Sequence, residues 1–298
     1  MYHVPVLLKE SVEGLNINPE GIYVDVTFGG GGHSREILKH LKGGKLYAFD
    51  QDADAVDNAK DLIGPNFTLI PANFRYIKKY LRLNGVDKVD GLLGDLGISS
   101  HQIDTPERGF SIRYDAPLDM RMDRAIDKTA ADIINKYSEH GLHSILGMYG
   151  EVRNAKTLAQ ALVKERINKP INRTSELIEV LSDYAPRGKE SKYYAQVFQA
   201  LRIEVNEELE ALKDLLEQSQ QVLKSGGRLS IISYHSLEDR LVKNFVQQGK
   251  FHGDAEKDLY GNTNKPFKSV GKAIDPDDEE KERNNRARSA RLRIAERE

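Results

Sequence analysis

The chain contains no cysteine, so disulfides, thiol catalysis and cysteine-based metal sites are excluded. This absence fits the cytoplasm, where disulfides rarely persist, and we expect the protein there. Histidines and carboxylates do not gather at the close spacing of zinc ligands, so no metal is predicted. No apolar run approaches the roughly 20 residues that a membrane span needs. Residues 1–10 lack a basic start followed by an apolar stretch, so we expect neither a membrane segment nor a secretory signal.

Strong net charge is absent as well, because 44 Lys and Arg stand against 46 Asp and Glu. The charges are nevertheless segregated near the end of the chain, where the acidic block 275–280 precedes a basic tail. From the residues alone this tail is either a solvated terminus or a local phosphate-binding patch on a neutral protein. Its cations are Lys281, Arg283, Arg286, Arg288, Arg291, Arg293 and Arg297.

The order of apolar segments indicates an α/β protein with a helical insertion. Strands and helices alternate over residues 22–97, which is typical of a parallel sheet with right-handed crossovers. No strand is expected between residues 99 and 200, and the α/β pattern then resumes. We therefore predict a discontinuous α/β domain over 1–102 and 204–298, with an all-helical domain inserted over 103–203. Expected strands are 22–28, 45–50, 67–74, 89–96, 228–234 and 288–295, and expected helices include 53–63, 129–135, 142–149, 155–168, 175–184, 195–203 and 206–223.

Four glycines, residues 29–32, lie between the first strand and the following helix, and Asp50 ends the second strand. Glycines there let main-chain N–H groups approach a ligand, and an acid about 20 residues on can bind both hydroxyls of a ribose. The turn is not a P-loop, because no Gly-Lys-Ser/Thr follows it. It fits the dinucleotide pattern poorly, because Ser34 stands where a third glycine or alanine belongs. The pattern favours a nucleoside-binding pocket of the kind that S-adenosylmethionine requires, and a purely structural turn is the alternative.

Three further residues border this turn in the predicted sheet. Asp25, late in the first strand, either pairs with the ammonium of a methionine moiety or holds the loop by hydrogen bonds. We expect His33 to contribute its backbone at the ligand. Phe74, after the third strand, either lies against an adenine face or packs in the core.

Two acceptor candidates follow the fourth and fifth strands, at the edge where ligands of open α/β sheets bind. Asp95 ends the fourth strand, where its carboxylate or the adjacent main-chain carbonyls can accept the N–H groups of a nucleobase amine during methylation. The alternative is that Asp95 only holds the loop. Gln102 follows and can cover the cofactor. His235 follows the fifth strand and is a second candidate to face the substrate, while Ser236 and Asp239 are interpreted as caps of the next helix.

The chain as a whole resembles the bacterial RsmH (MraW) family of 16S ribosomal RNA methyltransferases. The matching blocks run in order from one end of the chain to the other, which makes a chance resemblance a poor explanation. They are residues 3–8, 27–34, 95–100, 107–111, 117–122, 198–203, 233–240 and 285–289.

This resemblance implies a Rossmann-like class I S-adenosylmethionine-dependent methyltransferase sheet with an inserted all-helical domain that recognises RNA. It implies methyl transfer to N4 of one cytidine in the decoding region of 16S ribosomal RNA, with the small ribosomal subunit as partner. The cofactor contacts that it implies are Gly31, Gly32, His33, Asp50, Phe74, Asp95 and Gln102. Two alternatives stay open from the residues: a nicotinamide dehydrogenase, and a non-catalytic ribosome-assembly factor that binds RNA. The sequence does not fix whether the protein is a monomer or a dimer.

Overall fold

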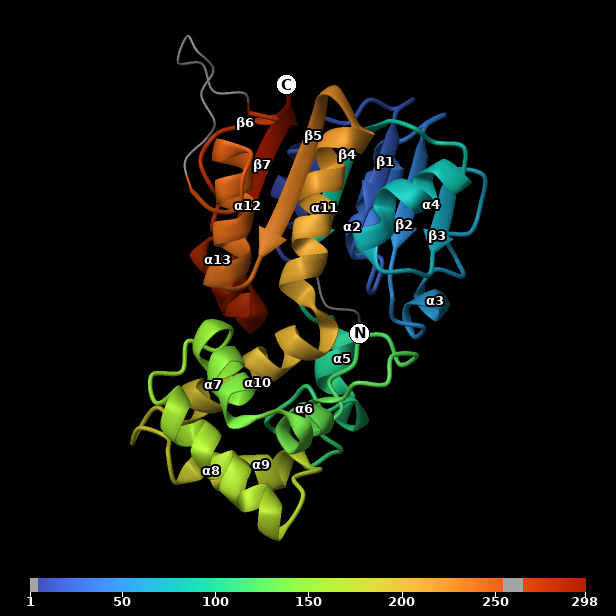
Figure 1. Ribbon diagram of the computed structural model, residues 1–298. Helices are drawn as coiled ribbons and strands as arrows, with labels where there is room; N and C mark the ends of the chain where they lie inside the picture. The colour runs from blue at the N-terminus through green and yellow to red at the C-terminus, as the bar shows by residue number, and fades with distance from the viewer. Residues whose placement is uncertain (1–4, 254–264) are drawn as a thin grey trace. The chain divides into compact units, whose positions relative to one another are not determined.

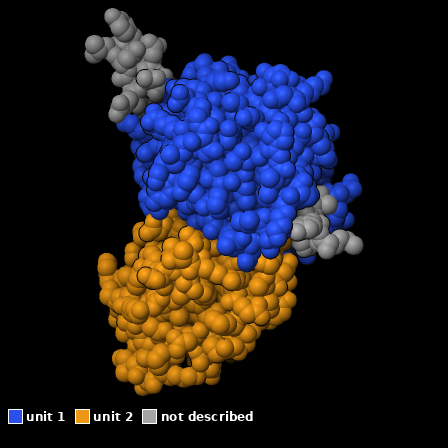
Figure 2. Space-filling model, turned by 90° about the vertical axis from the view of Figure 1, so that its right-hand side faces the viewer, with its two compact units in different colours: residues 1–97, 209–298 blue, residues 98–208 orange. Residues whose placement is uncertain are grey.

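The computed structural model describes residues 5–253 and 265–298 (Figure 1). The chain divides into two compact units, residues 1–97 with 209–298 and residues 98–208, which Figure 2 draws in different colours. The helical insertion expected over 103–203 falls inside the second unit. Among the described residues, none of the helices combines the length and apolar character required to cross a membrane.

The first unit is built on one sheet of seven strands, counted over the described residues, in the order β3-β2-β1-β4-β5-β7-β6. The first five strands are mutually parallel, and β7 runs antiparallel to both of its neighbours. The strands are β1 (Ile22–Asp25), β2 (Lys45–Phe49), β3 (Phe67–Ile70), β4 (Val89–Asp95), β5 (Leu223–Ser233), β6 (Phe267–Ser269) and β7 (Arg291–Arg297). The predicted α/β architecture with a parallel sheet is confirmed.

Helices cover both faces of this sheet because successive strand residues are apolar and point to opposite sides. In β1, Tyr23 packs with α1 and α2, whereas Val24 packs with α4, α11 and α12. In β4, Leu92 and Leu93 divide in the same way between the two cores. The helices of this unit are α1 (Leu8–Glu13), α2 (Gly32–His40), α3 (Ala55–Asn58), α4 (Ile77–Leu83), α11 (Glu208–Val222), α12 (Ser236–Gln248) and α13 (Asp278–Arg283), with 3-10 turns η1 (Phe74–Tyr76) and η3 (Asn285–Ser289).

The parallel strands end at one common edge of the sheet. Asp25 at the end of β1 is in register with Leu93 of β4, and Asp95 at the end of β4 is in register with Ile232 of β5. Hydrogen bonds continue just past the strands, from the Leu96 N–H to the Ile232 carbonyl at 3.0 Å. The loops after β1, β2, β4 and β5 therefore gather at this edge, as ligand-binding loops of open α/β sheets do.

The second unit is helical and has its own apolar core. Arg108 is only 2% exposed and donates hydrogen bonds to the carbonyls of Arg121 and Met122. Arg121 is bound to Asp119 by two hydrogen bonds of 2.8 Å. Its elements are α5 (Ser100–Asp104), η2 (Pro106–Arg108), α6 (Ala130–Lys136), α7 (Glu139–Met148), α8 (Ala155–Asn168), α9 (Thr174–Ser182) and α10 (Glu190–Asn206).

The helix predicted over 53–63 is wrong in extent, because α3 covers only Ala55–Asn58. The approach to α3 is held by aspartate side chains, since Asp50 accepts the Asp52 N–H and Asp52 accepts the Asp54 N–H. Such local side-chain bonds compete with helical ones. The helix predicted over 206–223 begins at Glu208 instead, because Glu207 takes a left-handed φ of 50° and separates α11 from α10.

The end of the basic tail, Arg291–Arg297, forms strand β7 of the sheet. The strand predicted over 288–295 begins at Arg291, because Asn284 accepts the Arg286 N–H and starts the 3-10 turn η3. Arg291 pairs with Asp275 at 2.8 Å and Arg293 with Asp239 at 2.6 Å. These two tail arginines are thus neutralised within the protein.

Candidate functional site

The glycine turn joins β1 to α2 and brings the chain very close to its neighbours. Gly29 and Gly31 have φ of 51° and 76°, a region that favours glycine. A Cβ on Gly32 would lie 2.1 Å from Pro5 Cγ, so only glycine fits there. Helix α2 begins at Gly32 without a side-chain cap, which leaves the N–H groups of its first turn available to a ligand. The turn is therefore suited to a ligand with oxygen acceptors.

Asp50, directly after β2, faces this turn. One carboxylate oxygen accepts the Gly29 N–H at 2.7 Å, and the other accepts the Asp52 N–H at 2.8 Å. Burial raises the pKa of Asp50 to about 6, against the lowering effect of these two hydrogen bonds. Each oxygen keeps a second lone pair. Asp50 can therefore hold the turn and still accept hydrogen bonds from two hydroxyl groups.

Asp25 lies beneath the turn and is fully buried. Its two oxygens accept the Thr27 N–H at 3.0 Å and the Ser34 hydroxyl at 2.7 Å. Desolvation raises the pKa of this carboxyl. These contacts show that Asp25 holds the loop by hydrogen bonds, which is one of the two roles expected from the sequence.

His33 and Asp95 lie next to each other beside the turn. The His33 ring is 5% exposed, and its Nε2–H donates to the Val6 carbonyl at 3.2 Å. Its Nδ1 lies 3.8 Å from Asp95 Oδ2. Burial lowers the pKa of His33, which favours the neutral ring. This ring therefore borders the Asp95 carboxylate without neutralising it.

Asp95 is fixed from two sides at the end of β4. Its N–H donates to the Thr27 hydroxyl at 2.6 Å, and its Oδ1 accepts the Tyr234 hydroxyl at 2.6 Å. Burial raises the pKa of Asp95 to about 7; the Tyr234 hydrogen bond lowers it, and the charges of Glu238 and Glu280 raise it. Oδ2 keeps acceptor capacity, and 24% of the side chain is exposed. Asp95 is thus a carboxylate that can accept hydrogen bonds and can take up a proton near neutral pH.

Sequence reasoning did not single out Tyr234, although it lies next to His235 at the end of β5. Nothing in the local sequence reveals its bond to Asp95, because the two residues are 139 positions apart. The signal that could have found it is topological: β4 and β5 are neighbouring parallel strands that end together.

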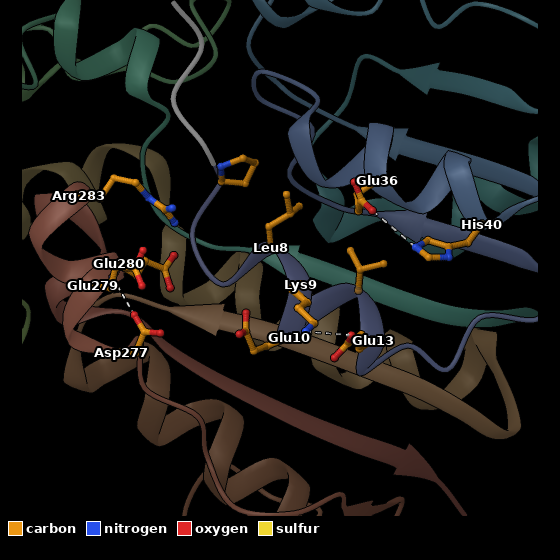
Figure 3. A pocket seen from close by; sticks show the side chains of 12 residues that line it. Leu8, Lys9, Glu10, Glu13, Glu36, His40, Asp277, Glu279, Glu280 and Arg283 are labelled. Carbon is orange, nitrogen blue, oxygen red and sulfur yellow. Dashed lines mark hydrogen bonds and ion pairs between the residues drawn. The ribbon is translucent and has the colours of Figure 1, made fainter.

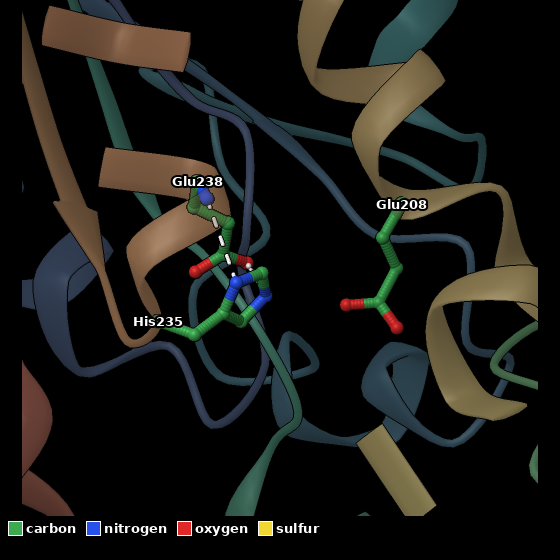
Figure 4. A group of neighbouring side chains, drawn as sticks. All are labelled: Glu208, His235 and Glu238. Carbon is green, nitrogen blue, oxygen red and sulfur yellow. Dashed lines mark hydrogen bonds and ion pairs between the residues drawn. The ribbon is translucent and has the colours of Figure 1, made fainter. Parts of the chain in front are cut away.

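His235 caps α12, a role that the sequence analysis gave to Ser236. The His235 Nδ1 accepts the Glu238 N–H at 3.5 Å (Figure 4). Its Nε2 lies 3.3 Å from a Glu238 carboxylate oxygen, yet it is buried and makes no hydrogen bond there. Asp239, also interpreted as a cap, instead pairs with Arg293. His235 therefore supports the loop after β5 through the start of the helix.

Phe74 and Gln102 were the remaining predicted contacts. Phe74 begins η1 just after β3 and is half-buried against the sheet core. Gln102 lies in α5 of the second unit, where its side-chain oxygen accepts the Ser99 N–H at 3.0 Å in a capping box. Its carboxamide is 5% exposed and thereby held in one orientation.

A cavity of about 520 Å³ lies elsewhere in the first unit, between α1, α2 and α13 (Figure 3). Its lining includes Glu10, Glu13, Glu36 and Glu279, together with a few cations. None of the predicted cofactor residues lines it. The candidate functional site is therefore the carboxyl edge of the sheet, where Asp50 and Asp95 flank the glycine turn, and not this cavity.

Comparison with known proteins gives a consistent result over the full length of the chain. The sequence model of the MraW methylase family matches residues 1–298. Ribosomal RNA small subunit methyltransferase H of Flavobacterium johnsoniae is 58% identical over 296 residues, covering 99% of this chain and 97% of the relative. The protein of that name from Parabacteroides distasonis is 55% identical over 298 residues, covering 99% and 97%. A putative methyltransferase of Streptococcus mutans, solved with SAH, aligns with a TM-score of 0.44 at 17% identity, covering 99% and 100%. On the family match and these relatives, the chain belongs to the MraW methylase family.

Proposed function

We propose that this protein transfers a methyl group from S-adenosylmethionine to N4 of one cytidine in the decoding region of 16S ribosomal RNA. The observation that carries the proposal is the convergence of the glycine turn, Asp50 and Asp95 at one edge of a parallel sheet. The names of the relatives supply the class of RNA. We further propose the cytoplasm as the place of reaction and the small ribosomal subunit as the partner.

The described residues fit a nucleoside cofactor. Gly32 leaves no room for a Cβ, and the start of α2 offers main-chain N–H groups. We assign the binding of the ribose hydroxyls to Asp50, because carboxylates accept hydrogen bonds from paired hydroxyl groups. The half-buried ring of Phe74 provides a face for the adenine. The full set that we propose to hold the cofactor is Gly31, Gly32, His33, Asp50, Phe74, Asp95 and Gln102, with Asp25 supporting the turn.

When bound, S-adenosylmethionine supplies a sulfonium methyl group, which the amine lone pair takes while the S–C electron pair stays on sulfur. The chain's part is to orient the amine and to receive its charge. Asp95 Oδ2 accepts an N–H of the cytosine amine, which directs the nitrogen lone pair and stabilises the positive charge that develops on it. The proton that the amine then releases passes to this carboxylate. We give His235 a positioning role, because its Nε2 is buried.

In the pH profile of kcat/KM, Tyr234→Phe is expected to move the decline on the acidic side to a pH about one unit higher. The pKa of Asp95 is about 7, so its accepting, ionised form is lost as the pH falls below 7. The Tyr234 hydrogen bond lowers this pKa, and charged hydrogen bonds of this kind correspond to roughly one to two pKa units. The measurement is kcat/KM between pH 5.5 and 9, which reports the free enzyme.

Tyr23→Phe is the matched control for this experiment. The Tyr23 hydroxyl accepts the Asn18 N–H at 2.7 Å in the same unit, and the residue is 1% exposed. Its loss removes a comparable hydrogen bond without touching Asp95, so the acid limb should stay in place. A Tyr234→Phe enzyme with an unshifted acid limb would refute the assigned role of the hydroxyl.

The decisive test of the proposed function is methyl transfer in vitro. Labelled S-adenosylmethionine is incubated with small ribosomal subunits, and with free 16S ribosomal RNA, from cells lacking this enzyme. We expect label on N4 of one cytidine, mapped by nuclease digestion and mass spectrometry. Binding of NAD in place of S-adenosylmethionine would favour a dehydrogenase. Tight RNA binding without methyl transfer to any substrate would favour a non-catalytic assembly factor.

A further inference from the structure

A group of exposed cations in the second unit has no side-chain partner among residues 5–253 and 265–298. Arg153, Lys156, Arg187, Lys189 and Lys192, hereafter the basic patch, are all exposed. Within the described chain, none of their side chains has a hydrogen bond or ion pair. Several other cations of this unit are bound internally, as Arg121 is to Asp119, Lys136 to Asp132, and Arg173 to Asp115. Arg113 and Lys164 also lack such a pair but stand singly in the sequence, whereas the basic patch groups five unpaired cations on two short segments.

One side chain holds the two halves of the basic patch together. The Asn154 carboxamide donates to the Tyr184 carbonyl at 3.1 Å and accepts the Tyr193 hydroxyl at 2.9 Å. Asn154 lies between the two cations that flank the start of α8. Tyr184 and Tyr193 lie on either side of residues 185–192, which carry the other three cations. Arg187 and Lys189 lie in a turn where Gly188 has a φ of 74° and the Lys189 N–H bonds to the Pro186 carbonyl, and Lys192 lies in the first turn of α10. These two hydrogen bonds of Asn154 therefore hold the start of α8 next to the segment that carries Arg187, Lys189 and Lys192.

The acids of these segments do not cancel the positive charge. Glu151, Asp183 and Glu190 are the acidic residues nearby in sequence, three against five cations. Glu190 is turned back on its own loop, where it accepts the Gly188 N–H at 2.8 Å. The whole unit is nearly neutral, with sixteen Lys and Arg against seventeen Asp and Glu over residues 98–208. The basic patch is thus a local excess of positive charge in a nearly neutral unit.

Half-buried aromatic rings accompany these cations. Tyr184 and Tyr194 are each partly exposed, and they flank the segment that carries Arg187, Lys189 and Lys192. Cations that contact phosphates, together with aromatic faces on which bases can stack, are the combination that single-stranded RNA selects. An acidic protein segment would bind the cations but would make no use of the exposed aromatic rings.

We propose that the basic patch binds the sugar–phosphate backbone of the substrate RNA, through residues other than those of the methyl-transfer site. The proposal rests on the proposed function for the kind of nucleic acid. The patch positions the RNA and adds affinity without reading sequence, because contacts to phosphates carry no base information. Its contribution is electrostatic and therefore decreases with salt.

The test compares two double variants with the same composition. Arg187→Gln with Lys189→Gln removes two patch charges, and Arg113→Gln with Lys164→Gln removes one arginine and one lysine outside it. Both control residues are exposed and have no side-chain partner in the described chain. Lys164 lies about 15 Å along α8 from Asn154, by the rise of 1.5 Å per residue. Retained helical circular dichroism shows that each variant is folded.

Binding of a single-stranded fragment of 16S ribosomal RNA is measured between 50 and 300 mM KCl, without cofactor. For the patch variant we expect the slope of log K against log salt to fall by about 1.4, since each lost contact on single strands is worth about 0.7. The control variant should keep the original slope. An unchanged slope in the patch variant overturns the proposal. So does weaker binding to small subunits with unchanged binding to the naked RNA, which would indicate a protein partner.

This outcome is distinguishable from a failure of the proposed function. If the wild-type protein transfers methyl groups to cytidine but the patch variant keeps its salt slope, only the patch assignment is wrong. If the slope falls while no methyl transfer to any RNA is found, the patch stands and the reaction assignment is wrong.

Discussion

Asp95→Ala is expected to lower the turnover number for methyl transfer by about 100- to 1000-fold, the range for loss of one positioned electrostatic contact to a developing charge. Asp95 is the carboxylate that ends β4, and its orientation is fixed by the Tyr234 hydroxyl and the Thr27 side chain. Without it, the amine of the target base loses the acceptor that orients its lone pair. The measurement is single-turnover transfer from saturating labelled S-adenosylmethionine to small ribosomal subunits.

Two companion variants separate this loss from damage to the fold. Asp87→Ala removes an exposed aspartate just before the same strand, at the opposite end of β4, and should leave turnover unchanged. Asp95→Asn keeps the size of the side chain but cannot take up the proton, so it should be impaired nearly as much as the alanine variant. Full turnover by Asp95→Asn would show that the negative charge of the carboxylate is not required.

Asp50→Ala is expected to weaken S-adenosylmethionine binding by about 1.5–3 kcal/mol, roughly 10- to 150-fold, the range for hydrogen bonds to a charged group. The loss has two physical sources. The carboxylate no longer accepts the ribose hydroxyls, and the Gly29 N–H loses the acceptor that fixes the glycine turn. Calorimetric titration of the free protein measures the effect directly.

The product S-adenosylhomocysteine provides the control ligand, because it has the same ribose but no sulfonium charge. Asp50→Ala should weaken both ligands by a similar factor. A selective loss of S-adenosylmethionine would mean that Asp50 acts on the sulfonium, and unchanged affinity for both would remove Asp50 from the site. In the wild-type protein, affinity should also decline below about pH 6, where Asp50 becomes protonated.

The sequence predicted the framework of the site because strand ends carry their own local signals. A short apolar run followed by an acid marks both Asp50 and Asp95, and the glycines mark the turn between β1 and α2. The contacts that define their chemistry are formed between distant segments. Neither the Tyr234–Asp95 bond nor the Asp239–Arg293 pair has a local signature, since β-strand pairing creates both.

Other differences between the sequence predictions and the structure arise where two local sequence signals favour different structures. Ser236 is a better cap by residue type than His235, yet the chain leaves β5 so that His235 takes the extended conformation and accepts the helix N–H. Residues 53–63 have helical spacing, but the side chains of Asp50 and Asp52 each bind a backbone N–H two residues on, before the helix can start. In the tail, charge density left a solvated terminus or an RNA contact open, whereas the alternation of apolar residues predicted the strand that the structure places at Arg291–Arg297.

The place of β7 in the sheet has a consequence for how the protein is made. β6 pairs with β7, which is inserted between it and β5, so β6 has no neighbouring strand until the residues of β7 have left the ribosome. The helical unit, whose residues are all translated earlier, can condense while β5 still presents an open edge to solvent. Such an edge is a template for pairing with other chains. A nascent chain stalled before residue 291 would carry this aggregation hazard, whereas one that has passed residue 297 can close it.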